Sequence, residues 1–334
     1  MKKSLASAML FSLFSCTNLE STSIEQGGSS HKCPQWENPQ VNPNLPVIGS
    51  HPDLQNVPEG LTLLGADGKP TSQLDCSKPT LVYITGRSPK GVGEFFRNPT
   101  AWTQKFNVFM FRWHRLGLDS QRIPLKSLNN TPSASKKLTP QLVKLIEILR
   151  VTKNSQEFRI VSHSLGGIIL TKSVHEVLDS LQSRPLRAEL LDPAFLLYDV
   201  RESIPDIPFV SPEIVNEMKF KLKNMTTQNV KVVVYPSAHS IDRASKLSDI
   251  ANVQAMNPLW LGGNTGTRHD MVREFYFNSF SQKKGLVSNP ELGMSEPFSA
   301  LYPTSAIPKS PKKLVQVQGE STVDISDDTF QIIP

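Results

Sequence analysis

The chain has 334 residues, a formal net charge of +6 and only three cysteines. No run of lysine and arginine dominates and no nucleic-acid-binding module occurs, so we interpret the charge as solvated surface and expect no nucleic-acid partner. The cysteines lack Cys-x-x-Cys spacing, the histidines are not paired at ligand spacing, and no glycine-rich loop carries the lysine of a nucleotide site. We therefore expect neither a metal nor a cofactor.

The first residues have the pattern of an export signal. Lys2 and Lys3 precede the mostly apolar stretch LASAMLFSLFS, which is too short for a permanent membrane span. The tetrapeptide LFSC resembles a bacterial lipobox, which implies cleavage of residues 1–15 and lipidation of the Cys16 thiol. We expect a membrane-anchored lipoprotein of the bacterial cell envelope; if the cell is Gram-negative, the place is the outer membrane or periplasm. The alternatives are an ordinary signal peptide cut nearby or an apolar tail on a soluble protein.

Lipidation of Cys16 would leave Cys33 and Cys76 as an even pair. Because an exported protein folds in an oxidising compartment, we predict a disulfide between them, with two free buried thiols as the alternative.

Proline, serine and asparagine divide the chain into regions. Residues 16–60 are rich in all three, so we interpret them as a tether between the lipid anchor and the folded part. Residues 61–283 are of a suitable length for one domain. Residues 284–334 form a proline-broken tail in which only KLVQVQ shows a short, strand-like alternation.

Within the domain, short apolar runs alternate with amphipathic stretches. Strands are predicted at 79–86, 105–113, 157–162, 187–192 and 230–235, and helices at 139–150, 165–182 and 212–225. The helix at 139–150 is predicted to begin with Thr139 as its cap and Pro140 in its first turn. The alternation predicts an α/β fold whose mostly parallel sheet is covered by helices on both faces.

The stretch FRIVSHSLGGIIL, residues 158–170, places a serine between a strand and a helix. The strand ends at Ser162 and the helix starts near Leu165, so Ser164 lies at the tip of a sharp turn, as a nucleophile elbow requires. Ser162 and Gly166 are small enough for the close backbone approaches of such a turn, and Gly167 allows close helix packing. The backbone N–H of Leu165, at the helix N-terminus, would face a developing oxyanion. The alternative is a serine in an ordinary strand-to-helix turn.

These residues carry a family resemblance. The segment 78–282 resembles the α/β-hydrolase fold, with similarities to lipases and esterases. RIVSHSLGG and ELLDPA are similar to paired motifs of the pancreatic-lipase family, and RHDMVREFYF is similar to the segment around that family's catalytic histidine. PTLVYITGR resembles the strand and turn that supply the second oxyanion donor, which implies the N–H of Arg87, although Thr85 replaces the usual histidine.

The chain order serine, acid, histidine in this fold indicates a histidine late in the domain. His269 fits because it follows the glycine-rich loop LGGNTGTR and precedes a helix-like run, and His239 is its competitor. Two aspartates end strands where the acid is expected. The pancreatic-lipase motif favours Asp192, whereas the spacing to His269 favours Asp242, and on the sequence alone we prefer Asp242 while keeping both.

The sequence thus predicts a serine hydrolase that cleaves carboxylic esters, of lipids or other acyl compounds, through an acyl-Ser164 intermediate. A thioesterase or acyltransferase with the same triad is an alternative, and so is a catalytically inactive, lipid-anchored binding protein. Residues 193–211 form an apolar, proline-broken insertion, which we interpret either as a lid and acyl-binding wall or as part of the domain's own core.

Overall fold

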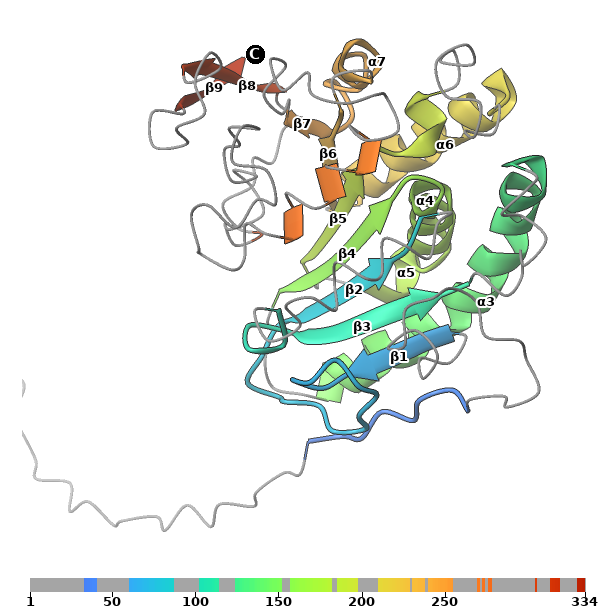
Figure 1. Ribbon diagram of the computed structural model, residues 1–334, viewed down its shortest axis with the longest axis vertical. Coiled ribbons are helices and arrows are strands. Elements are labelled where there is room, and N and C mark those ends of the chain that lie inside the picture. The colour runs from blue at the N-terminus through green and yellow to red at the C-terminus, as the bar shows by residue number, and fades with distance from the viewer. Residues whose placement is uncertain are drawn as a thin grey trace, which may run out of the picture. The chain divides into compact units, whose positions relative to one another are not determined.

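In the computed structural model, nine strands among the described residues form one sheet (Figure 1). The structure describes residues 33–40, 60–86, 102–113, 124–151, 157–181, 185–197, 210–228, 230–237, 240–254, 269, 270, 272, 273, 276, 277, 304, 313–318 and 329–333. The signal, Cys16, Arg87 and the middle of the predicted lid therefore lie outside the described residues.

The strands follow the order β1-β3-β2-β4-β5-β6-β7-β8-β9 across the sheet. Their bounds are β1 Gly60–Leu64, β2 Thr80–Ile84, β3 Asn107–Arg112, β4 Phe158–His163, β5 Leu186–Leu191, β6 Val230–Tyr235, β7 Asn252–Gln254, β8 Lys313–Gln318 and β9 Thr329–Ile333. Neighbours from β3 through β8 pair in parallel, while β1 and β9 are antiparallel to their partners. The five predicted strands are β2 to β6, so the mostly parallel sheet is confirmed.

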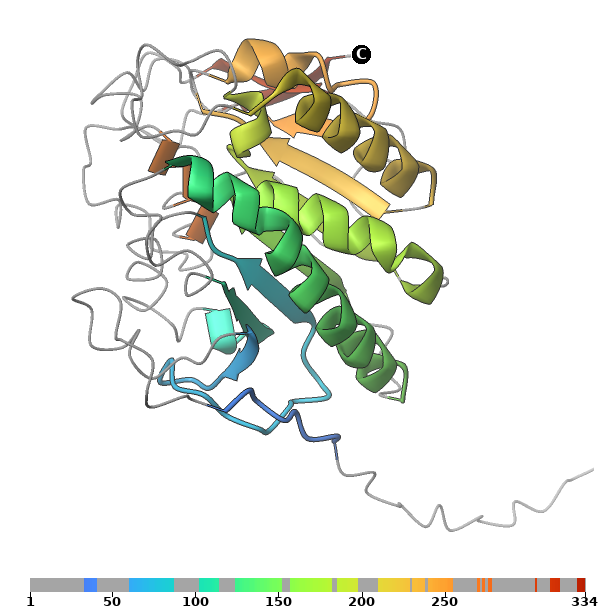
Figure 2. The ribbon, with the colours of Figure 1, turned by 90° about the vertical axis from the view of Figure 1, so that its right-hand side faces the viewer.

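Three helices cover one face of this sheet: α3 (Pro124–Val151), α4 (Gly166–Glu176) and α6 (Pro212–Thr227). They lie side by side in front of the strands (Figure 2). The strand residues facing them are aliphatic or aromatic, since alternate side chains such as Val82, Ile160 and Ala188 belong to one buried core with the helices. The short elements are α5 (Leu178–Leu181), the 3₁₀ turn η3 (Ala194–Leu196) and α7 (Ile241–Ser245).

Helix α3 begins 15 residues before its predicted start, because Pro132 and Pro140 are both accommodated inside it. Thr139 is an interior residue and not the cap. Its hydroxyl donates to the carbonyl of Ser135 (3.0 Å), and Thr131 does the same to the carbonyl of Leu128 (2.8 Å). A threonine directly before each proline therefore supplies a local hydrogen bond where the proline cannot donate one.

The opposite face of the sheet is polar and aromatic. Arg159 of β4 lies beside Arg187 of β5, and Glu189 follows two residues later on that face. Glu189 and Arg187 are fully buried and form an ion pair of 3.3 Å. The second cation, Arg159, lies in the same buried region and pairs with Glu157 at 2.5 Å.

Two tyrosines complete the environment of Glu189. Tyr235 of β6 donates its hydroxyl proton to one carboxylate oxygen at 3.0 Å, and Tyr276 donates to the other. Burial, followed by the charge of Glu189, raises the pKa of Tyr276 well above its ordinary value, so this hydroxyl remains a donor. Tyr276 and Phe277 are helical residues late in the chain, and Phe277 packs edge-on against Tyr83 of β2 (4.8 Å). Helical residues therefore contact both faces of the sheet.

Part of the predicted tether belongs to the folded domain. Trp36 is almost fully buried, its indole N–H donates to the carbonyl of Leu61 (3.1 Å), and its ring packs edge-on against Phe109 (5.0 Å). Cys33 and Cys76 form the predicted disulfide, with 5.7 Å between their Cα atoms. Residues 33–40 are therefore attached to the folded domain by the buried Trp36 side chain and by the Cys33–Cys76 disulfide.

The sheet also continues into the predicted tail. KLVQVQ forms β8 and pairs in parallel with β7, and β9 pairs with β8 near the end of the chain. None of the helices in the described ranges combines the length and apolar character needed to cross a membrane.

We predict that replacing Cys33 and Cys76 with serine lowers the free energy of unfolding by about 2 to 5 kcal/mol, because the open chain regains loop entropy. Thermal unfolding of the full chain measures this effect. A reductant should lower the Tm of the wild type towards that of the double variant and leave the variant unchanged. Equal Tm values for the oxidised wild type and the variant would contradict the prediction.

Candidate active site

The turn between β4 and α4 holds Ser164 in a left-handed backbone conformation, with φ of 55°. This region is sparsely populated by residues other than glycine and carries strain that the surroundings must offset. The N–H of Ser164 donates to the carbonyl of Leu191 (3.1 Å), and its carbonyl accepts from Gly167 and Ala194, both at 3.0 Å. The turn is thereby fixed to the end of β5 on one side and to α4 on the other, as the predicted elbow requires.

The small residues around this turn are needed for space. A Cβ atom on Gly166 would lie 2.7 Å from the carbonyl oxygen of Ile84 and 2.8 Å from that of Thr85. On Gly167 it would lie 2.7 Å from Cβ of Pro193. Ser162 is fully buried, and its hydroxyl lies 3.4 Å from the carbonyl oxygen of Glu189.

Leu165 precedes α4 with helical angles, φ −59° and ψ −26°. Within the described ranges its backbone N–H has no acceptor, and it lies at the helix end where partial positive charge gathers. The other predicted oxyanion donor, Arg87, lies outside those ranges, and Gly86 before it would place a Cβ only 3.1 Å from Cβ of Ser164.

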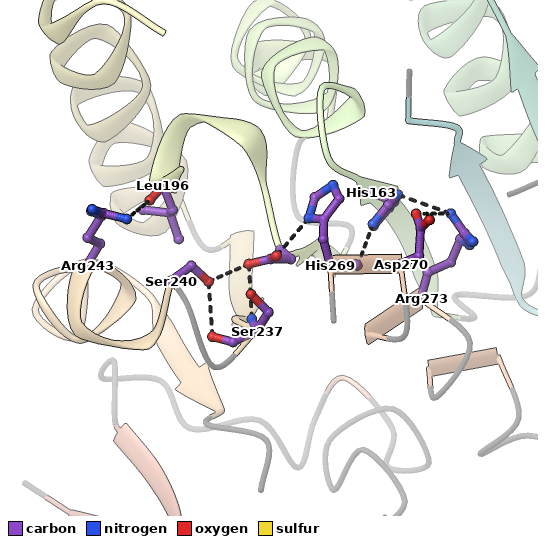
Figure 3. Close-up of polar contacts among 9 residues, drawn as sticks. His163, Leu196, Ser237, Ser240, Arg243, His269, Asp270 and Arg273 are labelled. Carbon is purple, nitrogen blue, oxygen red and sulfur yellow. Dashed lines mark hydrogen bonds and ion pairs between the residues drawn. The ribbon is translucent and has the colours of Figure 1, made fainter. Parts of the chain in front are cut away.

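Asp192 and His269 form a buried pair. Nδ1 of His269 and Oδ2 of Asp192 are 2.7 Å apart, and the carboxylate is fully buried (Figure 3). Asp192 directly follows β5 and has φ of 39°, a conformation that aspartate tolerates better than most residues. Its place after β5 brings it beside the Ser164 turn, since the flanking Leu191 and Ala194 both bond to the backbone of Ser164.

The other oxygen of Asp192 is held by the turn that follows β6. Oδ1 accepts from the N–H of Ser237 (3.0 Å) and from the hydroxyl of Ser240. Burial raises the pKa of Asp192, but His269 and these two serines outweigh it, so the pKa lies below its usual value. The group is therefore a carboxylate near neutral pH, and its Oδ2 can accept a hydrogen bond from Nδ1–H of His269.

The preference for Asp242 as the partner of His269 is thus corrected in favour of Asp192. Asp242 lies on α7, and its side chain is outside the described ones. The segment SAHSID after β6, where we expected the acid, contributes instead the two serines that hold Asp192. Local sequence could have identified Ser237 and Ser240 only as turn residues, because their acceptor comes from another strand.

The other described histidines, His163 and His175, have contacts of their own and do not bind Asp192. His163 is buried, and Nε2 of its ring lies 2.9 Å from the backbone carbonyl oxygen of His269 (Figure 3). His175 lies on α4, 3.3 Å from the amide nitrogen of Asn224. His31, His51, His114 and His239 lie outside the described residues.

No group of three or more metal-binding side chains gathers in the part of the chain that the structure describes. The arrangement provides a serine in a strained turn, a histidine–carboxylate pair and a helix-end N–H. These are the components of nucleophilic catalysis at an acyl carbon.

Comparisons with known proteins agree with the fold. A family model described as "Alpha/beta hydrolase of unknown function (DUF900)" matches residues 127–258, which span α3 to the residues just after β7. No curated protein matches the chain. With the parallel sheet and its strand-to-helix serine turn, this match identifies the α/β-hydrolase fold.

Several solved structures are similar. A Bacillus subtilis putative hydrolase is 13% identical over 58% of this chain and 78% of that one, with a TM-score of 0.32. The thioesterase domain from the curacin biosynthetic pathway is 12% identical over 59% and 89%, also with a TM-score of 0.32. Phospholipase PlaB from Legionella pneumophila is 14% identical over 50% and 40%, with a TM-score of 0.28.

We predict that Gly166→Ala destabilises the fold by about 1 to 3 kcal/mol, because the added methyl group meets two backbone carbonyls that cannot turn away. Chemical denaturation measures the change. Gly65→Ala is the matched control, since its methyl group would meet nothing closer than the side chain of Asp67, at 3.3 Å. A Gly166→Ala variant as stable as the control would contradict the tight packing of this turn.

Proposed function

We propose that this α/β-hydrolase-fold chain is a serine hydrolase that cleaves carboxylic esters through an acyl-Ser164 intermediate. The observation that supports this most is the buried Asp192–His269 pair beside the strained Ser164 turn. A buried carboxylate is costly unless it is hydrogen-bonded, and here one of its partners is the late histidine that the chain order of a triad requires. The pair therefore counts against the inactive binding protein.

The geometry assigns roles in the first step. Because Asp192 is ionised, Nδ1 of His269 carries the proton directed at it, which leaves Nε2 free to act as a base. Oγ of Ser164 attacks the ester carbonyl carbon while its proton passes to Nε2. The carbonyl oxygen takes the electron pair and faces the N–H of Leu165, with Arg87 as the proposed second donor.

Collapse of this tetrahedral intermediate expels the alcohol, which takes the proton from Nε2 and leaves the acyl group on Ser164. Water then attacks the acyl carbon and gives one proton to Nε2 of His269. The bond between the acyl carbon and Oγ breaks, Oγ takes the proton back from Nε2, and the acid leaves. Asp192 stays ionised throughout and stabilises the imidazolium formed in each half of the reaction.

The acyl part of the substrate is a separate question. Phe195, Leu196 and Leu197 of the predicted lid are buried, and the first two belong to the main core, which agrees with the interpretation of this part as the domain's own core. We propose lipid or other acyl esters as the substrate class on the similarity of RIVSHSLGG and ELLDPA to pancreatic-lipase motifs. Product analysis with water and with an alcohol acceptor distinguishes hydrolysis from acyl transfer, and a comparison of matched oxygen esters and thioesters distinguishes an esterase from a thioesterase.

We predict that Ser164→Ala abolishes labelling by a fluorophosphonate, and that Asp192→Asn slows it by about 10³- to 10⁴-fold, because the amide no longer orients and stabilises protonated His269. Asp242→Asn is the matched control and should react at the wild-type rate. Intact-mass spectrometry of the full chain measures the adduct over time.

Labelling that persists in Ser164→Ala would disprove the nucleophile. A loss of labelling in Asp242→Asn, with normal labelling in Asp192→Asn, would instead restore Asp242 as the acid.

We also propose that the chain is anchored to the cell-envelope membrane through a lipidated Cys16, which the LFSC motif and the disulfide of an exported protein support. We predict that Cys16→Ser moves the protein from the membrane fraction to the soluble fraction of a bacterial host. Ser15→Ala is the control and should remain with the membrane, since it leaves the thiol in place. Unchanged membrane retention of Cys16→Ser would disprove the anchor.

A further inference from the structure

His163, the residue directly before Ser164, links the serine turn to the segment that carries His269. It is the last residue of β4, and its ring lies on the polar face of the sheet, opposite α4. Nε2 of the ring is 2.9 Å from the carbonyl oxygen of His269, and the centroids of the two imidazoles are 4.5 Å apart. Nothing in the catalytic steps above uses this second histidine.

The hydrogen bonds around His163 determine its protonation. A backbone carbonyl can only accept, so Nε2 carries the proton and donates it to His269. Nδ1 is then an acceptor, and Nη1 of Arg273 lies 3.5 Å from it, itself held by Asp270 at 3.2 Å. Burial lowers the pKa of His163 well below its ordinary value, and the neighbouring His269 and Arg273 lower it further. The ring is therefore a neutral donor with a fixed orientation.

The space around the ring is also restricted. A Cβ atom on Gly86, at the end of the strand that leads to the proposed oxyanion loop, would lie 2.9 Å from Nδ1 of His163. The ring is thus enclosed by Gly86, His269 and Arg273. It has little freedom to turn away from the carbonyl of His269.

We propose that His163 is a positioning residue, which holds the backbone of His269 so that its imidazole keeps the orientation set by Asp192, in which it serves Ser164 in the proposed reaction. This inference rests on the proposed function. The physical reason is that catalytic geometry tolerates small errors only: a misplacement of about 1 Å can cost about 100-fold in rate. Asp192 fixes the ring of His269, and His163 fixes the main chain of His269. Because His163 directly precedes Ser164, this contact ties the proposed base to the proposed nucleophile.

The role of His163 is separable from the docking of the whole segment. Tyr276, farther along the same segment, is bound to the buried carboxylate of Glu189. Removing the His163 donor should therefore leave the segment on the sheet while freeing the main chain at His269. The expected defect is in rate and not in folding.

Two amide substitutions test this proposal in the full chain. Gln at position 163 can place an N–H donor near the position of Nε2, whereas Asn is too short to reach the carbonyl of His269. We expect His163→Asn to slow fluorophosphonate labelling of Ser164 by about 10- to 100-fold and His163→Gln to react at close to the wild-type rate. For an ester substrate the loss in His163→Asn should appear in kcat, with KM little changed.

His175→Asn is the matched control, because it removes a histidine from the outer helix layer and should not change the rate. Thermal unfolding of all variants establishes that they are folded. Equal labelling rates for folded His163→Asn and His163→Gln would overturn the proposal, while labelling of the wild type would still support the serine hydrolase. A folded wild type that does not label would overturn the proposed function itself.

A measurement on the wild type is independent of the variants. Nitrogen-15 NMR of the imidazoles should show His163 as the neutral tautomer with its proton on Nε2. A proton on Nδ1 alone, or a charged ring near neutral pH, would overturn the proposed donor.

Discussion

The buried carboxylate of Asp192 imposes the constraint on which the site depends. A charge removed from water is costly unless hydrogen bonds replace its hydration, and each of its oxygens finds partners from a different part of the chain. One oxygen binds His269 and the other binds Ser237 and Ser240. Because these groups are far apart in sequence, the carboxylate is satisfied only when β5, the turn after β6 and the late segment have all assembled. The contact between Asp192 and His269 in the candidate site therefore depends on the tertiary fold.

The two faces of the sheet bind the rest of the chain through different kinds of contact. On the aliphatic face, α3, α4 and α6 bind mainly through apolar packing, which tolerates many sequences of similar volume. The other face carries the Glu189–Arg187 ion pair, and the Glu189 carboxylate accepts a directional hydrogen bond from the hydroxyl of Tyr276. The segment that carries His269 thus packs on the face with directional contacts, whereas α3, α4 and α6 pack on the aliphatic face.

Sequence patterns were sufficient to predict those elements that are defined by residues close together in the chain. The apolar runs of β2 to β6 and the turn at Ser164 are defined within a few residues, and they were found. The partner of His269 was not resolved, since Asp192 and Asp242 both follow strands and only cross-strand geometry distinguishes them. Trp36 and β8 were assigned to irregular regions because surrounding prolines dominate the local composition, whereas burial of the indole and pairing with β7 are long-range effects.

The antiparallel pair of β8 and β9 has a consequence for the behaviour of the protein in solution. Strand β7 has three residues, and β8 pairs with it through Val253 and Gln254. If the chain ended before residue 313, the backbone donors and acceptors of β7 would form an open edge, to which a strand of another copy could add. Strand β8 therefore occupies the edge of β7, and β9 in turn pairs with β8, so shortening the protein before residue 313 would expose the edge of β7.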